Sequence, residues 1–264
     1  MHLILTGATG LCGSAVLDAM IKSKDITKIS IISRRPVKMA EDSKDPRINV
    51  LLHKNFEQYD AKLLSQLKGA RGCVWALGIS QTEVGAEEYV KITKDYALRA
   101  AEAFQTLGSD TQPFNFVYVS GDGTTHTPGR FTPIFGRVKG ETELLLAAMR
   151  KANPSFHASA IRPAFIDAAA HDAIKPYLPV PGLAKAVLLP PFAAAARTFM
   201  RSKCSPTEPL ARFMTDMAMG KLDARLQDAN VEKVGDFPIL ENSMFRELAG
   251  LDDKKDAALP RGRN

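Results

Sequence analysis

The sequence predicts an α/β fold in which helices cover both faces of a doubly wound parallel sheet. Short apolar runs alternate with helical patterns over roughly the first 170 residues, which is typical of βαβ units with right-handed crossovers. The chain has 264 residues, 45% hydrophobic and 24% charged, so it is long enough to bury a core without disulfides. After Asp167 the alternation gives way to clustered prolines, which predicts a change of architecture.

The first half of the chain supplies four of the predicted strands and two helices. The strands are short apolar runs, the second of them rich in isoleucine, at Leu3–Thr6, Lys28–Ser33, Ile48–His53 and Gly72–Ala76. A helix is expected at Ser14–Lys24, because Ala15, Val16, Ala19 and Met20 fall on one face of it. A longer helix is expected at Glu87–Leu107.

The second half continues the pattern and then loses it. Strands are predicted at Asn115–Ser120 and His157–Ile161, with a helix between them at Lys139–Lys151. Five prolines in the apolar stretch 176–200 interrupt regular structure, and a helical pattern returns at Thr207–Leu222. The residues Phe213, Met214, Met217 and Met219 of that last helical stretch are expected to pack in a core.

A glycine-rich turn joins the first predicted strand to the first predicted helix. Gly7, Gly10 and Gly13 have the spacing GxxGxxG, with Thr9 and Leu11 between them. Glycines at these points permit a sharp turn, close approach of backbone to a pyrophosphate, and tight packing of helix on strand. Backbone N–H groups and the helix dipole then favour the negative charge. We therefore expect one Rossmann-type domain, with a dinucleotide-binding core over 1–170 and a small C-terminal substrate lobe over 171–264.

Two arginines follow the second predicted strand and predict which dinucleotide binds. Sites for NAD usually place an acidic residue here against the ribose hydroxyls, whereas this chain has Arg34 and Arg35. Guanidinium groups pair with phosphate, so the expected cofactor is NADP, with either arginine on the 2′-phosphate. The alternative interpretation is a solvated pair of charges at the end of a strand.

Several motifs together resemble one family. They are Thr6-Gly7-Ala8-Thr9-Gly10-Leu11-Cys12-Gly13, Ser33-Arg34-Arg35, Ala76-Leu77-Gly78, the stretch Glu83–Ala103, Val138-Lys139-Gly140-Glu141 and Arg162-Pro163. In this order they resemble the atypical short-chain dehydrogenase/reductases, in the branch of the Tat-interacting-protein-like oxidoreductases and their fungal relatives. The resemblance covers roughly the first 170 residues.

The resemblance implies positions for further cofactor contacts. Leu77 and Gly78 would lie beside the adenosine and nicotinamide riboses. Asn55-Phe56 would flank the adenine, and Arg162-Pro163 would lie near the nicotinamide. The same family uses a Tyr-x-x-x-Lys pair on one helix and a Ser or Thr after the fifth strand. Its tyrosine donates a proton, and its lysine lowers the tyrosine pKa and holds the nicotinamide ribose.

The sequence departs from that catalytic pattern at one position. Lys139 occupies the lysine position, but the tyrosine position is Phe135, and a phenyl ring has no proton to donate. Ser120 is the expected serine, with Asp122 as the alternative in a shifted register. Tyr118 is expected to be a core residue, and His126 in the following loop is a second candidate proton donor.

Composition excludes other classes of protein. The net charge is +6, but the basic residues are scattered and no nucleic-acid-binding motif occurs. The cysteines Cys12, Cys73 and Cys204 are far apart, which is typical of a reducing compartment and predicts neither disulfide nor metal site. We expect a cytoplasmic monomer or homodimer without a signal peptide or membrane span.

These observations predict an NADP-dependent oxidoreductase that acts on a small carbonyl compound. Because Phe135 replaces the usual proton donor, two alternatives stay open. One is a regulatory or interaction protein that binds NADP(H) without catalysis. The other is a cofactor-dependent isomerase or dehydratase, since fold alone does not decide the reaction.

Overall fold

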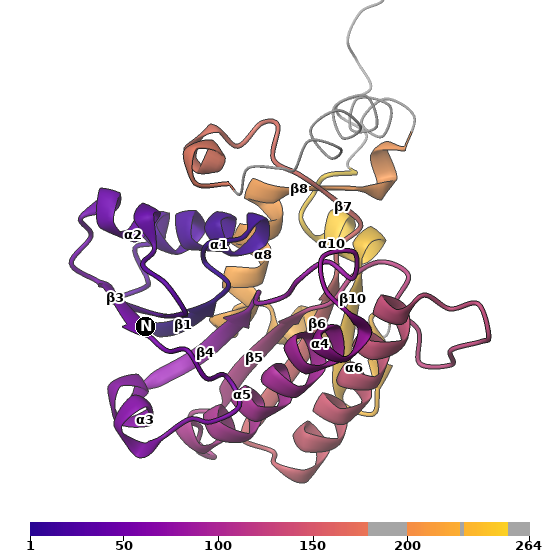
Figure 1. The fold of residues 1–264 in the computed structure, drawn as a ribbon, viewed down its shortest axis with the longest axis horizontal. Helices are drawn as coiled ribbons and strands as arrows, with labels where there is room; N and C mark the ends of the chain where they lie inside the picture. Colours follow the sequence, from indigo (N-terminus) through magenta and orange to yellow (C-terminus); the bar gives the residue numbers. More distant parts are fainter. Residues whose placement is uncertain (179–199, 228–229, 253–264) are drawn as a thin grey trace, which may run out of the picture.

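The protein is built on one eight-stranded sheet, which Figure 1 shows with β3 toward one side of the view and β10 toward the other. The computed structural model describes residues 1–178, 200–227 and 230–252. In chain order the strands of the sheet are β1 (His2–Thr6), β2 (Lys28–Ser33), β3 (Ile48–Leu52), β4 (Ala70–Trp75), β5 (Phe114–Val119), β6 (Phe156–Arg162), β9 (Glu232–Val234) and β10 (Phe237–Glu241). Their spatial order is β3-β2-β1-β4-β5-β6-β10-β9, and all neighbours are parallel except β10 and β9. The predicted doubly wound fold is confirmed.

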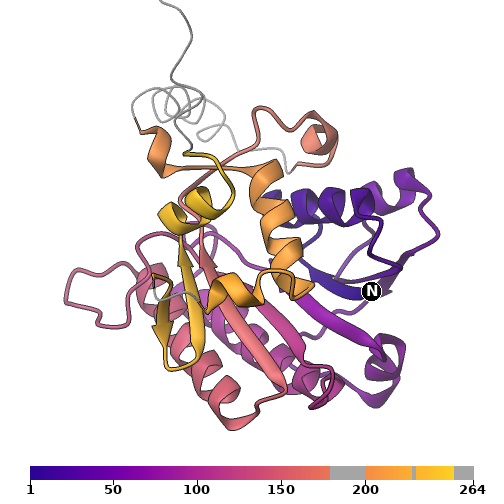
Figure 2. The same ribbon diagram turned by 180° about the vertical axis from the view of Figure 1, so that it is seen from behind.

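Side chains from the strands alternate between two cores. On one face, Leu3 and Leu5 of β1 pack with α1 (Leu11–Lys22), α2 (Lys38–Ser43) and α8 (Thr207–Ala218). On the other face, Ile4 packs with α3 (Ala61–Leu67) and α5 (Tyr96–Phe104), while α6 (Ile134–Ala152) contributes Leu146 and Ala147. Figure 2 shows α1 and α8 together on the first of these faces. This alternation is the period-two pattern expected of strands with two buried faces.

All six predicted strands occur, with ends within two residues of those expected. The long helix expected at Glu87–Leu107 is instead composite: α4 (Ala86–Val90), a π-helical turn η1 (Lys91–Asp95), α5, and a 3₁₀ turn η2 (Gln105–Leu107). A π turn inserts one residue into a helix. The buried Tyr118 hydroxyl donates to the carbonyl of Thr93 in that turn at 3.3 Å, and Tyr118 is the core residue predicted.

The helix predicted at Lys139–Lys151 begins earlier, at Ile134. Gly136 permits the longer helix because a Cβ there would lie 2.7 Å from the carbonyl of Gly123. The earlier start places Phe135 and Lys139 one turn apart on the same helix.

The C-terminal third contributes to the central core. The helix predicted at Thr207–Leu222 ends at Ala218, and the predicted core residues Phe213, Met214, Met217 and Met219 are buried. Sequence analysis did not predict β10, which extends the main sheet beside β6. The other elements here are short: β7 (Phe165–Asp167) paired with β8 (Cys204–Pro206), η3 (Asp172–Tyr177), η4 (Arg201–Lys203), α9 (Asp223–Leu226) and α10 (Asn242–Leu248).

Most of the proline-rich stretch 176–200 lies outside the described residues. Within residues 1–178, 200–227 and 230–252, no helix has the length and apolar character needed to cross a bilayer.

Candidate active site

A tight glycine turn lies at the carboxyl edge of the sheet, where the strand order reverses between β1 and β4. Gly7 follows β1 directly and has a φ of +70°, a conformation that favours glycine. A Cβ on Gly7 would lie 2.3 Å from the Ala76 carbonyl oxygen. A Cβ on Gly13 would lie 2.0 Å from the Gly7 carbonyl oxygen. These two glycines therefore hold β1, the end of β4 and the first turn of α1 in direct contact.

The N-terminus of α1 is open toward this edge. Its N-cap residue is Gly10, no side chain caps it, and its first turn contains no acidic residue. The Gly10 N–H donates to the Gly7 carbonyl at 2.9 Å, and Thr9 and Leu11 are partly exposed on either side. The first N–H groups of a helix have no partner within the helix, so they are available to an anion. The turn fits the pyrophosphate of a dinucleotide for this reason.

The end of β4 lies beside the same turn. The Leu77 N–H donates to the Thr6 hydroxyl at 3.3 Å, and Gly78 is exposed with open space around its Cβ position. The Phe56 ring is fully buried between Trp75 and Tyr96 and packs in the core, and the position of Asn55-Phe56 beside the adenine stays a prediction. A phenyl ring suits that aromatic cluster better than a surface next to a ligand, and only Asn55 of the pair is exposed.

The two arginines follow β2, at the same edge of the sheet. Ser33 ends the strand and donates its hydroxyl to the Arg35 carbonyl at 2.7 Å, which fixes the backbone at the turn. Both Arg34 and Arg35 are exposed, and neither guanidinium forms an ion pair with a described residue. Two exposed guanidinium groups at the same edge as the glycine turn suit a phosphate monoester.

Lys139 reaches from α6 to the carboxyl edge of β5. Its ammonium donates to the carbonyl oxygens of Ser120 at 2.7 Å and Val119 at 3.3 Å. Burial lowers the pKa of Lys139 to about 8 and raises that of the Cys12 thiol to about 11, and each group's charge acts on the other. The end of β5 lies at the same carboxyl edge of the sheet as the glycine turn that follows β1. The structure thus places the predicted lysine at the edge that carries this turn.

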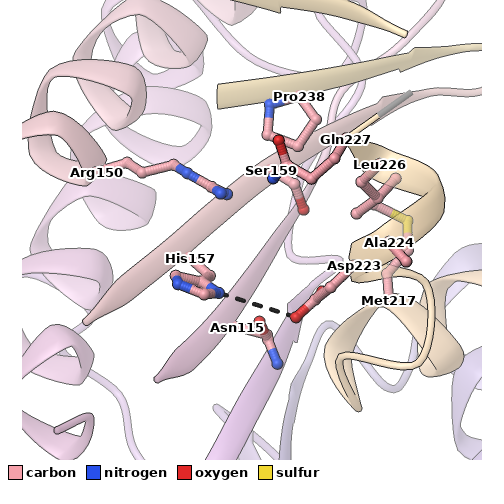
Figure 3. Close-up of a pocket in the computed structure, with 10 residues that line it drawn as sticks. All are labelled: Asn115, Arg150, His157, Ser159, Met217, Asp223, Ala224, Leu226, Gln227 and Pro238. Carbon is pink, nitrogen blue, oxygen red and sulfur yellow. Dashed lines mark ion pairs between the residues drawn. The ribbon is translucent and has the colours of Figure 1, made fainter. Parts of the chain in front are cut away.

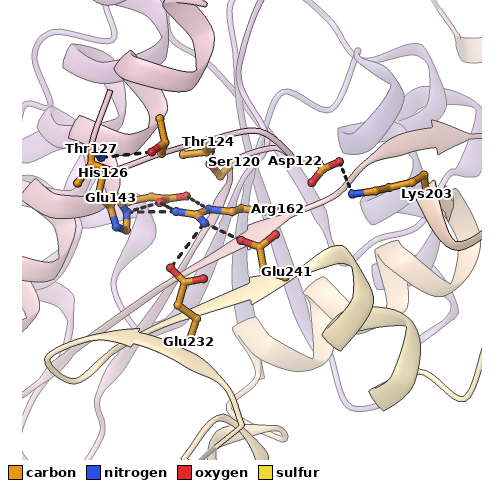
Figure 4. Close-up of polar contacts among 11 residues, drawn as sticks. Ser120, Asp122, Thr124, His126, Thr127, Glu143, Arg162, Lys203, Glu232 and Glu241 are labelled. Carbon is orange, nitrogen blue, oxygen red and sulfur yellow. Dashed lines mark hydrogen bonds and ion pairs between the residues drawn. The ribbon is translucent and has the colours of Figure 1, made fainter. Parts of the chain in front are cut away.

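Ser120 and Asp122 occupy different environments, as Figure 4 shows. The Ser120 hydroxyl is buried and lies 3.2 Å from that of Thr124. Asp122 is partly exposed and accepts a hydrogen bond from Lys203 at 3.0 Å. Asp122 is therefore bound by Lys203 of η4. Of the two residues, Ser120 is the one whose carbonyl accepts the hydrogen bond from Lys139.

Phe135 lies in the first turn of α6. Its ring carbon Cζ packs toward Gly123, where a Cβ would lie 3.3 Å away. Its backbone N–H donates to the Gln81 side chain at 3.2 Å, so a residue from the loop after β4 caps this helix. The ring therefore lies against the loop that follows β5, one helical turn before Lys139.

A buried polar network under α6 was not predicted from the sequence (Figure 4). Glu143 is fully buried and accepts hydrogen bonds from Arg162 at 3.1 and 2.5 Å. The His126 Nε2 lies 2.8 Å from Glu143 and 3.1 Å from Arg162, which also pairs with Glu241 at 2.6 Å. Arg162 therefore compensates a buried carboxylate, while the position of Arg162-Pro163 near a nicotinamide stays a prediction.

The network also constrains His126, the second candidate proton donor. Its ring is held between Glu143 and Arg162. Spacing along the sequence gave no indication of this contact, because its three members are 17 to 36 residues apart. In the described part of the chain, no group of three or more His, Cys, Asp or Glu is placed to hold a metal ion.

The buried ammonium of Lys139 predicts a dependence of stability on pH. The unfolded chain keeps the Lys139 proton up to about pH 10.4, whereas the folded chain releases it near pH 8. The unfolded state therefore binds more protons between these values, and the free energy of unfolding rises with pH.

We expect this rise to be up to about 1 kcal/mol between pH 8 and 9, measured by urea unfolding, and absent in Lys139→Met. Above that window the raised pKa of Cys12 acts in the opposite direction, because the folded state then holds the extra proton. Equal pH dependence in the two proteins would contradict the assignment to Lys139.

Comparison with known proteins places the chain among curated relatives. No family model matches it. It is 43% identical over 156 residues to botcinic acid biosynthesis cluster B protein 16 of Botryotinia fuckeliana, covering 59% of this chain and 99% of that protein. It is 39% identical over 203 residues to leucinostatins biosynthesis cluster protein T of Purpureocillium lilacinum, covering 70% of this chain and 72% of that protein.

Among solved structures, the fold matches UDP-glucose-4-epimerase from Stenotrophomonas maltophila, whose structure has NAD bound. The TM-score is 0.64 at 14% identity, over 85% of this chain and 75% of the epimerase. A likeness at this identity establishes a shared Rossmann-type fold. The two sequence relatives establish more: the chain belongs to the family that includes botcinic acid biosynthesis cluster B protein 16 and leucinostatins biosynthesis cluster protein T.

Proposed function

We propose that the protein is an NADP(H)-dependent oxidoreductase of the atypical short-chain type that acts on a small carbonyl compound. The observation that carries this proposal is that the open N-terminus of α1 and the ammonium of Lys139 lie at the same carboxyl edge of the sheet. An anion site on one side and a cation on the other suit a dinucleotide lying across the carboxyl edge of the sheet. The motif resemblance supports the Tat-interacting-protein-like branch.

The chain's own groups have distinct tasks in this proposal. A bound nicotinamide supplies or accepts hydride, and the protein supplies position and polarity. Gly7, Gly10 and Gly13 bring backbone N–H groups to the pyrophosphate, and Leu77-Gly78 line the adjacent edge. Lys139 holds the ribose hydroxyls of the nicotinamide end, since its third N–H is not used by Ser120 or Val119. The Ser120 hydroxyl donates to the substrate oxygen.

The test is binding followed by turnover. NADPH fluorescence should change saturably on addition of protein, and NADPH should then be oxidised in the presence of one class among aldehydes, ketones and quinones. Absence of binding by either NADPH or NADH would refute the proposal.

One observation favours a second function. Phe135 lies on α6 where the related enzymes carry tyrosine, and its ring packs on Gly123 with no proton to give. A protein that binds NADP(H) as a regulatory or interaction module needs no donor at this place. Saturable binding of NADPH without oxidation by any compound of the panel would support this function instead.

Cofactor choice gives a separate prediction. NADPH should bind more tightly than NADH by about 1–3 kcal/mol, because only NADPH carries the 2′-phosphate that pairs with Arg34 or Arg35. Arg34→Ala and Arg35→Ala are compared by fluorescence titration with both cofactors. At least one should lose NADPH affinity and keep its NADH affinity.

Lys38→Ala is the matched control, since Lys38 is an exposed cation close to the same turn. Its NADPH affinity should stay within about twofold of the wild type, as expected for a screened surface charge. Equal affinity of the wild type for NADPH and NADH would overturn the assignment of NADP.

A further inference from the structure

A second polar pocket lies at the opposite, amino-terminal edge of the sheet, where β5, β6 and β10 begin. We call it the distal pocket, and Figure 3 shows the side chains that line it. It has a volume of about 230 Å³, and the residues used below are Asn115, Arg150, His157, Ser159, Asp223 and Pro238. The proposed function makes no use of any of them.

The pattern of residues on the strands builds the distal pocket. On the sheet face toward α8, Val117 and Ile161 are buried core residues. The same face carries Asn115 nearer the start of β5, and His157 and Ser159 nearer the start of β6. Polar residues thus replace apolar ones where these strands begin. Asn115 and Ser159 are almost fully buried, at 8% and 4% exposure, so their polar groups point into an enclosed space.

Arg150 enters the pocket through a gap in the sheet. Pairing of β6 with β10 begins at Ala160 and Ile239, and the preceding residue of β10 is Pro238, which has no N–H to donate. The Ala158 carbonyl instead accepts a hydrogen bond from Arg150 Nη1 at 2.7 Å. The guanidinium comes from the end of α6 and is directed toward Ser159 and His157 in Figure 3.

Arg150 forms no ion pair with a carboxylate among the described residues, although the charges of Asp236 and Asp223 act on it from a greater distance. Burial lowers the pKa of Arg150. Four of its five N–H donors are free of the Ala158 contact. A partly buried guanidinium without a carboxylate partner is a site for an anion.

Ser159 adds a hydroxyl donor to the pocket. Its side chain lines the pocket, it is more than nine-tenths buried, and its hydroxyl makes no hydrogen bond within the described residues. The hydroxyl oxygen is not among the fully buried atoms without a partner, so it is accessible from the pocket. A ligand oxygen in the pocket could accept a hydrogen bond from it beside Arg150.

The other side of the pocket presents an acceptor. Asp223 of α9 lies 3.9 Å from His157 Nδ1, and burial raises the pKa of the Asp223 carboxyl. Burial and the charge of Arg150 lower the pKa of His157, so the imidazole is neutral near pH 7. The Asn115 amide donates weakly to the Ala218 carbonyl, at 3.4 Å, and its oxygen is left for a donor. The pocket therefore has a cation on one side and acceptors on the other.

We propose that the distal pocket binds a small organic carboxylate that also carries a hydroxyl donor. The carboxylate pairs with Arg150 and accepts from Ser159, and the hydroxyl donates to Asp223 or Asn115. At about 30 Å³ per water, the pocket holds roughly eight waters, so the ligand has about ten non-hydrogen atoms or fewer. A carboxylate is preferred to phosphate because Asp223 opposes a second negative charge on the ligand.

The test uses glycolate, acetate and inorganic phosphate with the whole protein at pH 7. Signals of the His157 ring in NMR spectra, assigned with His157→Gln, should shift saturably with glycolate. Acetate, which lacks the hydroxyl, should bind about tenfold more weakly, as loss of one hydrogen bond predicts. Phosphate should bind more weakly than glycolate.

Ser159→Ala and Arg150→Gln should each weaken glycolate about tenfold or more. Arg99→Gln, which removes an exposed arginine of α5, should leave glycolate binding unchanged. Ser159→Ala is a small change that keeps the Arg150 contact with Ala158, so it answers the question even if Arg150→Gln does not fold.

Three results would overturn the proposal: no saturable shift with glycolate, equal affinity in the wild type and Ser159→Ala, or tighter binding of phosphate than of glycolate. None of them bears on NADPH binding, which takes place at the other edge of the sheet in the proposed function. NADPH titration of Ser159→Ala should therefore match that of the wild type.

Discussion

Gly10→Val is expected to lower NADPH affinity at least a hundredfold, about 2.7 kcal/mol, while the protein stays folded. A single Cβ at this position meets only the Gly7 carbonyl oxygen, at 3.4 Å, so the fold tolerates it. The two γ-methyl groups of valine, however, would extend from the N-cap of α1 into the space in front of its free N–H groups. A pyrophosphate needs that space, and its contacts are lost together.

The experiment compares NADPH fluorescence titrations with circular dichroism and thermal unfolding of the same variant. Gly129→Val is the matched control, because Gly129 is exposed with open space around its Cβ position. Gly7 and Gly13 are unsuitable for this purpose, since a Cβ on either would collide with backbone and unfold the turn. A folded Gly10→Val protein with wild-type NADPH affinity would show that the turn does not hold the cofactor.

The glycine turn was predictable because all its determinants are local. The apolar run before Gly7, the spacing of the glycines and the helical pattern after Gly13 lie within 24 residues of one another. Parallel strands then place the ends of β1, β2, β4 and β5 at one edge by topology alone. For this reason the sequence also predicted that Arg34-Arg35, Leu77-Gly78 and Ser120 share an edge with the turn.

Other features depend on contacts that a sequence pattern does not contain. The strand β10 has five residues, one of them proline, and proline usually argues against an interior strand. Its place beside β6 is possible because Arg150 satisfies the carbonyl that Pro238 leaves unpaired. This hydrogen bond from α6 to β6 is a tertiary contact, and it outweighs the low preference of proline for an interior strand.

The site shows the same limit. The resemblance implied that Arg162-Pro163 lies near the nicotinamide, but it gave no sign that a buried carboxylate 19 residues away binds the Arg162 guanidinium. Leaving Glu143 unpaired in the core would cost about 3–5 kcal/mol, and that penalty fixes the direction of the arginine. The π turn that offers the Thr93 carbonyl to Tyr118 is likewise a one-residue insertion that periodicity over twenty residues does not reveal.

Phe135→Tyr is expected to raise turnover of the preferred carbonyl compound by about 10²–10⁴-fold, the usual contribution of a general acid. The phenol would stand on the face of α6 that carries Lys139, one turn away. The new hydroxyl would be attached to the Cζ atom, the end of the ring that lies close to Gly123. The ammonium of Lys139 would favour the phenolate and lower the pKa of the tyrosine.

Matched variants separate this gain from changes in binding. Phe135→Leu keeps the site apolar and should show no gain, and NADPH affinity should be unchanged in both variants. Lys139→Ala should weaken NADPH binding in either background, because it removes the cation at the carboxyl end of β5, the edge of the sheet that carries the glycine turn. In the double variant with Phe135→Tyr, the gain in turnover should fall, since the phenol then lacks the charge that lowers its pKa.

The wild-type rate decides how the result is interpreted. If turnover is already rapid with phenylalanine at this position, another group donates the proton, and His126→Ala is the next measurement. That variant should have little effect if Glu143 and Arg162 hold the imidazole as tightly as their distances of 2.8 and 3.1 Å indicate. If Phe135→Tyr binds NADPH normally and gains no activity with any compound of the panel, the missing hydroxyl is not what limits the reaction. The protein is then a binding module or performs another reaction at the same edge of the sheet.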